Sequence, residues 1–339
     1  MTSAAARETM RQRFYRVTAE LLDTDPRVAI VLADIGVGYL EGFGVFERHP
    51  RRAINVGIRE ALMVSTAAGM ALEGLRPIAH SYAPFLVERS FEQVKLDFGH
   101  QGVGGILVSV GASYDWAEGG RTHHSPGDAA LINSLPDWTI HVPGHADELE
   151  TLLRAAVADD GAVYIRLSDA HNQAPVMDGC AGLALVRQGG PSGGSGATTI
   201  LAVGPMLRPV LEATGDLDAT ILYTATPRPL DADSLRELVT GTDVVLVEPY
   251  LEGTSAAALA AALVDRPIRL LSIGVPVVEL RRYGTREDHD RAYGLDAAGL
   301  RKRLKEFLVQ SQDAKHQGKY QASGVIAKRG APQARDPSR

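Results

Sequence analysis

The chain is poor in cysteine and in long apolar runs. Of its 339 residues only Cys180 is a cysteine. One thiol cannot form an internal disulfide or a Cys-x-x-Cys metal site, and this usage is typical of a reducing compartment. The first residues lack the apolar core of a secretion signal, and the longest apolar run, 256–264, is too short to cross a bilayer. We therefore expect a cytoplasmic protein that does not enter a membrane.

The chain also lacks an excess of positive charge. Lys and Arg number 35 against 41 Asp and Glu, which gives a formal charge of −6. No general polyanion-binding surface follows from this balance, so we expect no nucleic-acid partner. The 45% apolar content over 339 residues excludes a disordered chain and predicts two domains with sizeable cores.

Nucleotide-binding motifs are missing as well. Neither G-x-x-x-x-G-K-[ST] nor G-x-G-x-x-G between a strand and a helix occurs. The glycine-rich runs 36–38 and 102–105 lack the third element of such motifs. We interpret both as turns and do not expect a nucleotide site there.

The first part of the chain alternates short β-rich runs with helical patterns. The expected strands are 28–33, 77–82, 105–110, 139–142 and 162–167. The expected helices are 58–73, 84–98, 128–134 and 146–158. This alternation predicts a three-layer α/β domain over 1–180, with a mostly parallel sheet covered by helices on both faces.

A linker and a second, smaller α/β domain follow. The run GGPSGGSG at 189–196 has no side chains that could pack, so we place a linker at 181–197. Periodicity resumes over 198–310, which predicts another three-layer α/β domain with a mostly parallel sheet. The expected strands there are 199–203, 219–223, 243–247 and 268–273, and the expected helices are 206–214, 234–239 and 255–264. The polar residues 311–339 show no apolar period, and we expect them to be disordered.

Two polar clusters are expected at one edge of the first sheet. Glu60 stands in the first turn of the apolar helix 58–73, where it could simply complement the helix dipole. Because that helix is apolar almost all round, we expect burial on both sides and a specific partner for the carboxylate. The loop after strand 105–110 carries His123 and His124, which could also be ordinary surface histidines.

A third cluster follows strand 77–82. It contains Tyr82 and Phe85 within the run SYAPFLVER. Phe85 could be an ordinary core residue, but its place beside the other two clusters favours a surface on which another ring can stack.

These clusters, in this order, resemble the pyrimidine-binding half of thiamine diphosphate enzymes of the transketolase type. The resemblance extends from about residue 8 to 308 and continues into that family's carboxyl-terminal domain. Its most specific elements are the G-x-R-E run and the T-H-H loop. The runs that carry the resemblance are ADIG, NVGIREALM, RPIAHSYAPFLVERSFEQV, GGRTHH, YIRLS, LVEPYLEGTSAAALAAAL and RRYGTREDHDRAYGLDAAGL.

The resemblance implies a cofactor-binding role for several residues. Glu60 matches the glutamate that contacts N1′ of the cofactor's pyrimidine ring and promotes its imino tautomer, so that the thiazolium C2 proton can be removed. Phe85 matches the aromatic residue that stacks on the pyrimidine. The resemblance also places Tyr82, Arg89 and Ile35 at the cofactor, and it implies a ketol transferase.

A second set of residues would face the substrate. His123 matches the histidine that binds the sugar or carries its proton, and His124 replaces the family's glutamine. By resemblance, Arg121, His80 and Asp169 would line the same site. No metal ligand is assigned to this chain.

The sequence departs from sugar-phosphate transketolases at three substrate positions. Gly119 replaces an aspartate and Gly111 replaces a histidine, while Asp169 replaces the arginine that clamps the substrate phosphate. A carboxylate would repel a phosphate. We therefore expect a substrate other than an ordinary pentose phosphate, such as an unphosphorylated, amino- or deoxy-substituted sugar or a small 2-oxo acid. The remaining candidates for anion ligands are Arg11, Arg121 and Arg166.

One family motif is missing altogether. The Gly-Asp-Gly run that holds Mg²⁺ and the diphosphate occurs nowhere in the chain. The resemblance therefore implies a carboxyl-terminal subunit of a split enzyme. An amino-terminal partner would bind Mg²⁺ and the diphosphate and share the thiamine diphosphate, in a heterotetramer that is a dimer of heterodimers. The chain alone should be inactive.

Two other functions stay open. One is a thiamine-dependent 2-oxo-acid decarboxylating subunit or one similar to deoxyxylulose-phosphate synthase, which would also use Glu60. The other is a non-catalytic paralogue, against which the intact G-x-R-E run, Phe85 and His123 argue. The second domain offers no residue for the chemistry, and we expect it to serve assembly.

Overall fold

The computed structural model describes residues 8–177, 179, 182–190 and 198–322, and side chains up to residue 309. It divides the chain into one compact unit, Met1–Leu300, and another, Arg301–Arg339. Cys180 lies outside the described residues. Among the described residues, none of the helices combines the length and the apolar character needed to span a membrane.

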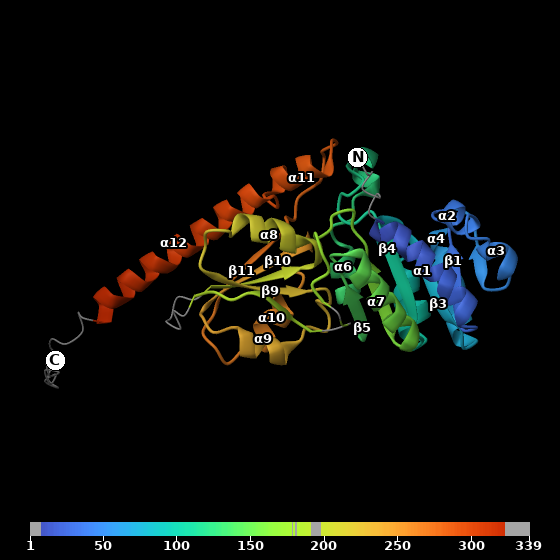
Figure 1. Ribbon diagram of the computed structural model, residues 1–339, viewed down its shortest axis with the longest axis horizontal. Helices are drawn as coiled ribbons and strands as arrows, with labels where there is room; N and C mark the ends of the chain where they lie inside the picture. Colours follow the sequence, from blue (N-terminus) through green and yellow to red (C-terminus); the bar gives the residue numbers. More distant parts are fainter. Residues whose placement is uncertain (1–7, 178, 180–181, 191–197, 323–339) are drawn as a thin grey trace, which may run out of the picture. The chain divides into compact units, whose positions relative to one another are not determined.

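A six-stranded parallel sheet forms the first half of the larger unit (Figure 1). Its strand order is β2-β1-β3-β4-β6-β5. Because all the strands are parallel, their carboxyl ends meet at one edge, where the loops after β1, β3, β4 and β6 come together. The strands are β1 (Val28–Leu32), β2 (Ala53–Asn55), β3 (Arg76–Tyr82), β4 (Gly105–Val110), β5 (Trp138–His141) and β6 (Ala162–Arg166).

Helices cover both faces of this sheet. On one face α1 (Met10–Thr24) and α7 (Ala146–Ala158) lie side by side (Figure 1), joined by ion pairs from Arg13 to Asp147 and Glu150. Successive strand residues point to opposite faces, so Ile30, Ile78 and Ile106 pack in the core beneath α1 and α7, whereas Val31, Ala79 and Leu107 join the other core. The helical segments of the first half are, besides α1 and α7, α2 (Val37–Glu41), α3 (Val45–Arg48), α4 (Glu60–Leu72), η1 (Pro84–Glu88), α5 (Phe91–Gln93), η2 (Val94–His100), η3 (Ala117–Gly119), η4 (Arg121–His123) and α6 (Asp128–Asn133).

A five-stranded sheet forms the second half, in the order β11-β10-β8-β9-β7. Its strands are parallel except for β7, which is antiparallel to β9. The α/β fold class and the mostly parallel sheets expected from the sequence are confirmed. The elements are β7 (Ala184–Arg187), β8 (Thr198–Val203), η5 (Gly204–Met206), α8 (Leu207–Ala213), β9 (Ala219–Thr224), α9 (Ala232–Leu238), β10 (Asp243–Leu251), α10 (Ala256–Ala262), β11 (Arg269–Val275), α11 (Arg286–Tyr293) and α12 (Ala297–Ala322).

The structure differs from the sequence expectations at several elements. The predicted helix 84–98 is divided into η1, α5 and η2. Edge strand β7 lies inside the predicted linker. Helix α12 continues to Ala322, although disorder was expected from 311; residues 323–339 lie outside the described part. Helix α4 is not buried on both sides, because Ile58 just before it, Leu62 and Leu72 are exposed in this chain.

A buried arginine ties together the amino ends of the first sheet. Arg76 begins β3, is 2% exposed, and donates to the carbonyl oxygens of Ala156 at 2.6 and 2.9 Å and of Gly161 at 2.7 Å. These carbonyls belong to the end of α7 and to the turn before β6. Arg76 therefore satisfies buried acceptors of two elements at once.

Replacing Arg76 by Met should destabilise the fold. The Ala156 and Gly161 carbonyls would lose their donor, at about 1–3 kcal/mol of unfolding free energy for each one left unsatisfied. Urea unfolding measures the loss. The matched control is Arg27→Met, which removes an exposed pair with Asp160 and should change the unfolding free energy by less than about 1 kcal/mol. Equal losses for the two variants would contradict this account of Arg76.

Candidate active site

Glu60 is a buried carboxylate at the start of α4. It is 4% exposed, and its Oε2 accepts a hydrogen bond from Nη1 of Arg89 at 2.9 Å. The helix dipole at this first residue favours the negative charge. The described residues give Oε1 no hydrogen-bond partner. A buried carboxylate with one oxygen in an ion pair and the other unused is able to accept a hydrogen bond from a ligand.

Arg89 also covers an aromatic ring. Its guanidinium carbon lies 4.3 Å from the centre of the Phe85 ring, and its side chain is half exposed. Arg89 and Phe85 come from the irregular helical turn after β3, so one short segment brings both to Glu60. The contact between cation and ring and the ion pair together fix the position of the Arg89 guanidinium.

Four rings form an aromatic cluster, which we define as Tyr82, Phe85, Trp116 and His123. The His123 ring centre lies 4.3 Å from that of Trp116, 5.1 Å from Phe85 and 6.0 Å from Tyr82. Tyr82 stacks on Trp116 at 5.5 Å. The elements after β3 and β4 therefore meet, as expected from the parallel topology.

Gly111 permits this packing. It follows β4 with φ of +70°, and a Cβ there would lie 2.4 Å from Cδ1 of Tyr82. A larger residue would displace the Tyr82 ring or strain the backbone. The absence of a side chain at 111 thus has a local structural reason.

A cavity of about 200 Å³ is lined by Arg11, which also contacts the Tyr82 ring of the aromatic cluster. Arg11 links the two, since its guanidinium carbon lies 5.6 Å from the Tyr82 ring centre and 5.2 Å from that of Tyr39. Asp169, expected at the substrate, lines this cavity and is exposed. The charged or polar residues around the cavity include Glu8, Arg11, His145, Ser168, Asp169 and His171.

His80 is buried away from any open surface. Its Nδ1 donates to the Val108 carbonyl at 2.8 Å, and its Nε2 accepts from the Tyr15 hydroxyl at 2.9 Å. Burial lowers its pKa to about 3, a change opposed by the bond to Val108. The interpretation of His80 as a substrate ligand therefore does not fit the structure, because both ring nitrogens are engaged inside the core.

Other expected substrate residues are also turned elsewhere. His124 is fully buried, its ring centre is 5.2 Å from that of His289, and burial lowers its pKa. Arg121 is exposed and pairs with Glu279 at 2.8 Å. The structure thus brings His123 to the cluster but not its neighbour, because adjacent loop residues point in different directions.

Two further candidates have defined surroundings. Ile35 is half-buried in the loop after β1. Arg166 is fully buried, and its Nε lies 2.8 Å from Oδ2 of Asp128. Tyr164 also donates to that Asp128 oxygen, at 2.6 Å. Arg166 is therefore a core residue whose charge is balanced by Asp128, although its Nη1 has no hydrogen-bond partner among the described residues.

The sequence interpretation missed Trp116 and gave Arg11 no more than a place among anion candidates. No local pattern marks Trp116, which joins the cluster only through packing of the loop.

Within the described ranges, no group of three or more His, Cys, Asp or Glu residues could hold a metal ion. The site therefore combines four clustered rings with a buried carboxylate, and Arg89 contacts both Phe85 and Glu60.

Comparisons with known proteins give the family to which the first half of this chain is similar. Residues 7–173 match the family model of the transketolase pyrimidine-binding domain. The chain is 48% identical to an uncharacterized 33.6 kDa protein of the fasciation locus of Rhodococcoides fascians, over 85% of this chain and 91% of that protein. It is 30% identical to a 1-deoxy-D-xylulose-5-phosphate synthase of Geobacter sulfurreducens over 88% of this chain and 49% of that enzyme.

Solved structures show the same fold. A split-gene transketolase, described as an inactive β4 tetramer, superposes with a TM-score of 0.76 at 24% identity, over 89% of this chain and 99% of that one. A transketolase of Campylobacter jejuni gives 0.69 at 18% identity, over 88% of this chain and 46% of that one. The fold is that of an α/β protein, and residues 7–173 match a transketolase pyrimidine-binding domain.

The chain belongs to the transketolase family, whose enzymes depend on thiamine diphosphate and bind it partly through the pyrimidine-binding domain. It spans about half the length of the synthases it matches.

The buried state of His80 predicts a pH dependence of stability. Its pKa is about 3 in the folded chain and about 6.5 when exposed, so below pH 6.5 the unfolded chain binds a proton that the folded chain does not. Stability is therefore lost as pH falls from 6.5 towards 3, by about 2 kcal/mol between pH 7 and pH 5. His80→Gln should remove this part of the loss in urea unfolding at the two pH values.

A second buried histidine provides the comparison. Burial lowers the pKa of His141 to about 4, so His141→Gln should reduce the pH dependence in the same direction. If His80→Gln kept the full loss of stability between pH 7 and pH 5, the buried neutral state of His80 would be refuted.

Proposed function

We propose that this chain is the carboxyl-terminal subunit of a two-chain, thiamine diphosphate-dependent transketolase that transfers a two-carbon ketol unit between a ketose and an aldehyde. The observation that carries the proposal is the buried Glu60 carboxylate, which Arg89 joins to the Phe85 ring. An acceptor oxygen and an aromatic face, both in contact with one arginine, are the two features that an aminopyrimidine requires.

Glu60, Phe85 and Tyr82 would hold the pyrimidine end of the cofactor. When bound, thiamine diphosphate supplies a nucleophilic carbon and an electron sink. Glu60 would share a proton with the ring nitrogen through Oε1, while Arg89 balances the charge of the carboxylate through Oε2. Burial of Glu60 keeps water from competing for that proton.

His123 would carry a proton at the substrate. Its Nδ1 lies 2.9 Å from the Thr122 hydroxyl and 3.3 Å from the Gly119 carbonyl. Because a carbonyl only accepts, this arrangement favours the proton on Nδ1 and leaves Nε2 as a base. Nε2 has no hydrogen-bond partner among the described residues, so it is available to a substrate hydroxyl.

A partner chain would provide the diphosphate and Mg²⁺ site. The sequence contains no Gly-Asp-Gly run. In addition, Ile58 is 74% exposed and Leu62 is 45% exposed, on either side of Glu60. An exposed apolar face beside a buried carboxylate is typical of a surface that another protein covers. We infer a dimer of heterodimers that works in the cytoplasm.

The substrate would differ from ordinary pentose phosphates. Asp169 lines the cavity that Arg11 joins to the aromatic cluster, and a phosphate there would meet the negative charge of Asp169 as well as the positive charge of Arg11. The cavity suits an unphosphorylated, amino- or deoxy-substituted sugar, or a small 2-oxo acid.

A second candidate function is a thiamine-dependent reaction of a 2-oxo acid with loss of carbon dioxide. It is favoured by the 30% identity to deoxyxylulose-phosphate synthases over most of this chain. Release of carbon dioxide from pyruvate by the reconstituted pair would select this function over ketol transfer.

Glu60→Gln should abolish activity of the chain reconstituted with its partner. The amide cannot exchange a proton with the pyrimidine, so turnover should fall by at least about 100-fold in a steady-state assay with thiamine diphosphate. The control is Glu73→Gln at the exposed end of the same helix, which should retain full activity.

The chain without its partner should show no turnover, and this rate is the baseline with which the reconstituted pair is compared. An unchanged rate for Glu60→Gln in the pair would favour a non-catalytic paralogue. Robust turnover by the chain alone would exclude the split-enzyme proposal.

A panel of donors and acceptors tests the substrate class. The reconstituted pair should turn over unphosphorylated sugars or small 2-oxo acids at least about tenfold better, in kcat/KM, than xylulose 5-phosphate with ribose 5-phosphate. Asp169→Arg should shift the preference towards the phosphorylated pair, because it reverses the charge at the cavity. Equal or better use of the pentose phosphates by the unaltered pair would end this proposal.

A further inference from the structure

The loop that carries His123 has little internal structure of its own. We call residues 113–125 the His123 loop. Its two ends are joined where the Ser125 N–H donates to the Ser113 carbonyl at 2.8 Å. Between these ends lie only the short turns η3 and η4. The other internal backbone bonds of the loop each span three residues, such as His123 N–H to the Gly120 carbonyl at 2.9 Å, and they close only local turns. The placement of the whole loop, and of His123 with it, therefore depends also on what the loop contacts.

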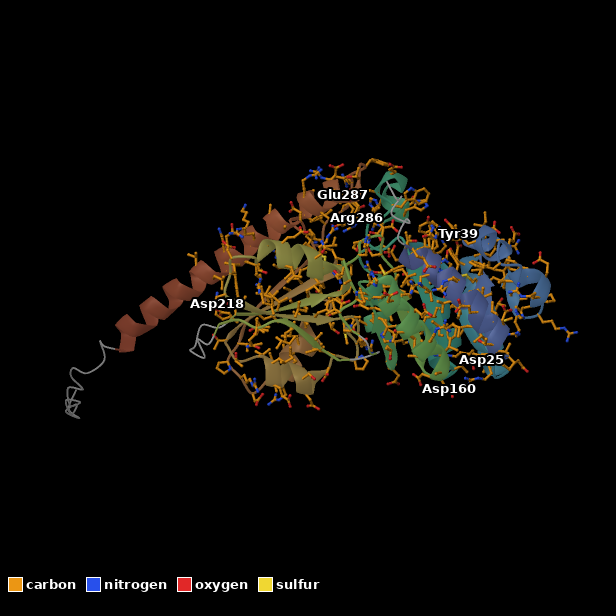
Figure 2. All side chains as sticks on the ribbon, in the orientation of Figure 1. Asp25, Tyr39, Asp160, Asp218, Arg286 and Glu287 are labelled. Atoms are coloured by element: carbon orange, nitrogen blue, oxygen red, sulfur yellow. The ribbon has the colours of Figure 1, made fainter. Side chains whose placement is uncertain are left out.

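One group of contacts joins the loop to the start of α11. Oδ1 of Asp115 lies 3.2 Å from Nε of Arg286, and the Tyr114 hydroxyl donates to Asp290 at 2.8 Å. Arg286 in turn contacts Asp290 at 3.2 Å. Figure 2 labels Arg286 near the blue-green segment that contains the loop. Asp115 is nearly fully buried, so the pair is shielded from solvent.

The far side of the loop is held as well. Arg121 pairs with Glu279 at 2.8 Å. The ring of Tyr283 lies against Gly120, where a Cβ would be 2.6 Å from Cε1 of the tyrosine. Gly120 has φ of +67°, so it combines a backbone conformation and a close approach that other residues would not tolerate.

Asp115 connects these contacts to the cavity. Its Oδ2 accepts from the backbone N–H of Asp169 at 2.9 Å, and its Oδ1 accepts from the Ser168 hydroxyl at 3.2 Å. Burial raises the pKa of Asp115 to about 6, and the Arg286 guanidinium opposes this change. The Asp115 carboxylate thus contacts the rim of the cavity and α11, and it fixes the position of the His123 loop relative to both.

We propose that the segment 279–290 of the second α/β half positions the His123 loop, with Arg286 as the principal positioning residue and Glu279 as the second. This assigns to the second half a task beyond assembly. A buried pair such as Asp115 with Arg286 fixes an arrangement more than it adds stability, and removing one partner leaves a buried charge uncompensated. The proposal concerns the free chain and does not depend on which substrate is used.

Trp116 is a reporter inside the loop. The chain contains two tryptophans, so Trp138→Phe leaves Trp116 as the single fluorophore. In this background the acrylamide quenching constant measures the access of solvent to Trp116. The change in Trp116 emission on His123→Gln measures how strongly the neighbouring imidazole quenches that fluorescence. Arg286→Met should raise the acrylamide constant about 1.5- to 2-fold and abolish the emission change caused by His123→Gln. Arg286→Lys should restore most of both signals.

The matched control is Arg236→Met, which removes an ion pair with Asp265 at another place in the second half. It should leave both signals unchanged. Far-ultraviolet circular dichroism shows whether Arg286→Met folds. If it does not, Glu279→Gln tests the second contact, the exposed ion pair of Glu279 with Arg121. The acrylamide constant of Trp116 should then rise by a smaller, measurable amount.

Unchanged Trp116 signals in folded Arg286→Met, or in Glu279→Gln when the arginine variant does not fold, would overturn the proposal. So would equal effects of Arg236→Met and Arg286→Met. Because no cofactor, partner or substrate is needed, this result is independent of the activity assays.

Discussion

The contact of the Glu60 carboxylate with Arg89, and of Arg89 with Phe85, is the constraint on which the site depends. Glu60 is held out of water at the start of α4, where one oxygen is satisfied by a half-exposed guanidinium and the other is unused. Burial of a charge is tolerated only with such a partner. Helix α4 and the turn after β3 meet because parallel strands bring their carboxyl ends to one edge, so the fold itself creates the site.

Side chains of the second half of the chain contact a loop at this edge of the first sheet. Contacts of Arg286 with Asp115 and of Tyr283 with Gly120 reach the loop that bears His123. Glu60 lies on helix α4 and His123 lies on a loop with only short turns of its own. The two side chains can act on one ligand only if contacts fix the position of that loop. On our proposal, the first sheet fixes Glu60 and the segment 279–290 of the second half fixes the loop that carries the histidine.

Sequence reasoning predicted the regular elements well because their signals are local. Helix 146–158 and strand 105–110 match the structure in their bounds, since clear apolar periods end at polar residues. The segment 84–98 carries a helical period but contains π-helical turns that no period reveals. Trp116 was missed, and the orientation of His124 was misjudged, because both are decided by packing against distant residues. The carboxylate and the ring were proposed as site residues because the family motif marks them, and the structure joins them through Arg89.

The most direct test of the central claim is a structure of this chain with its partner and thiamine diphosphate. The account predicts that an oxygen of Glu60 lies within hydrogen-bonding distance of N1′ of the pyrimidine and that the Phe85 ring lies against that heterocycle. A pyrimidine bound by other residues, with Glu60 contacting only Arg89, would contradict it.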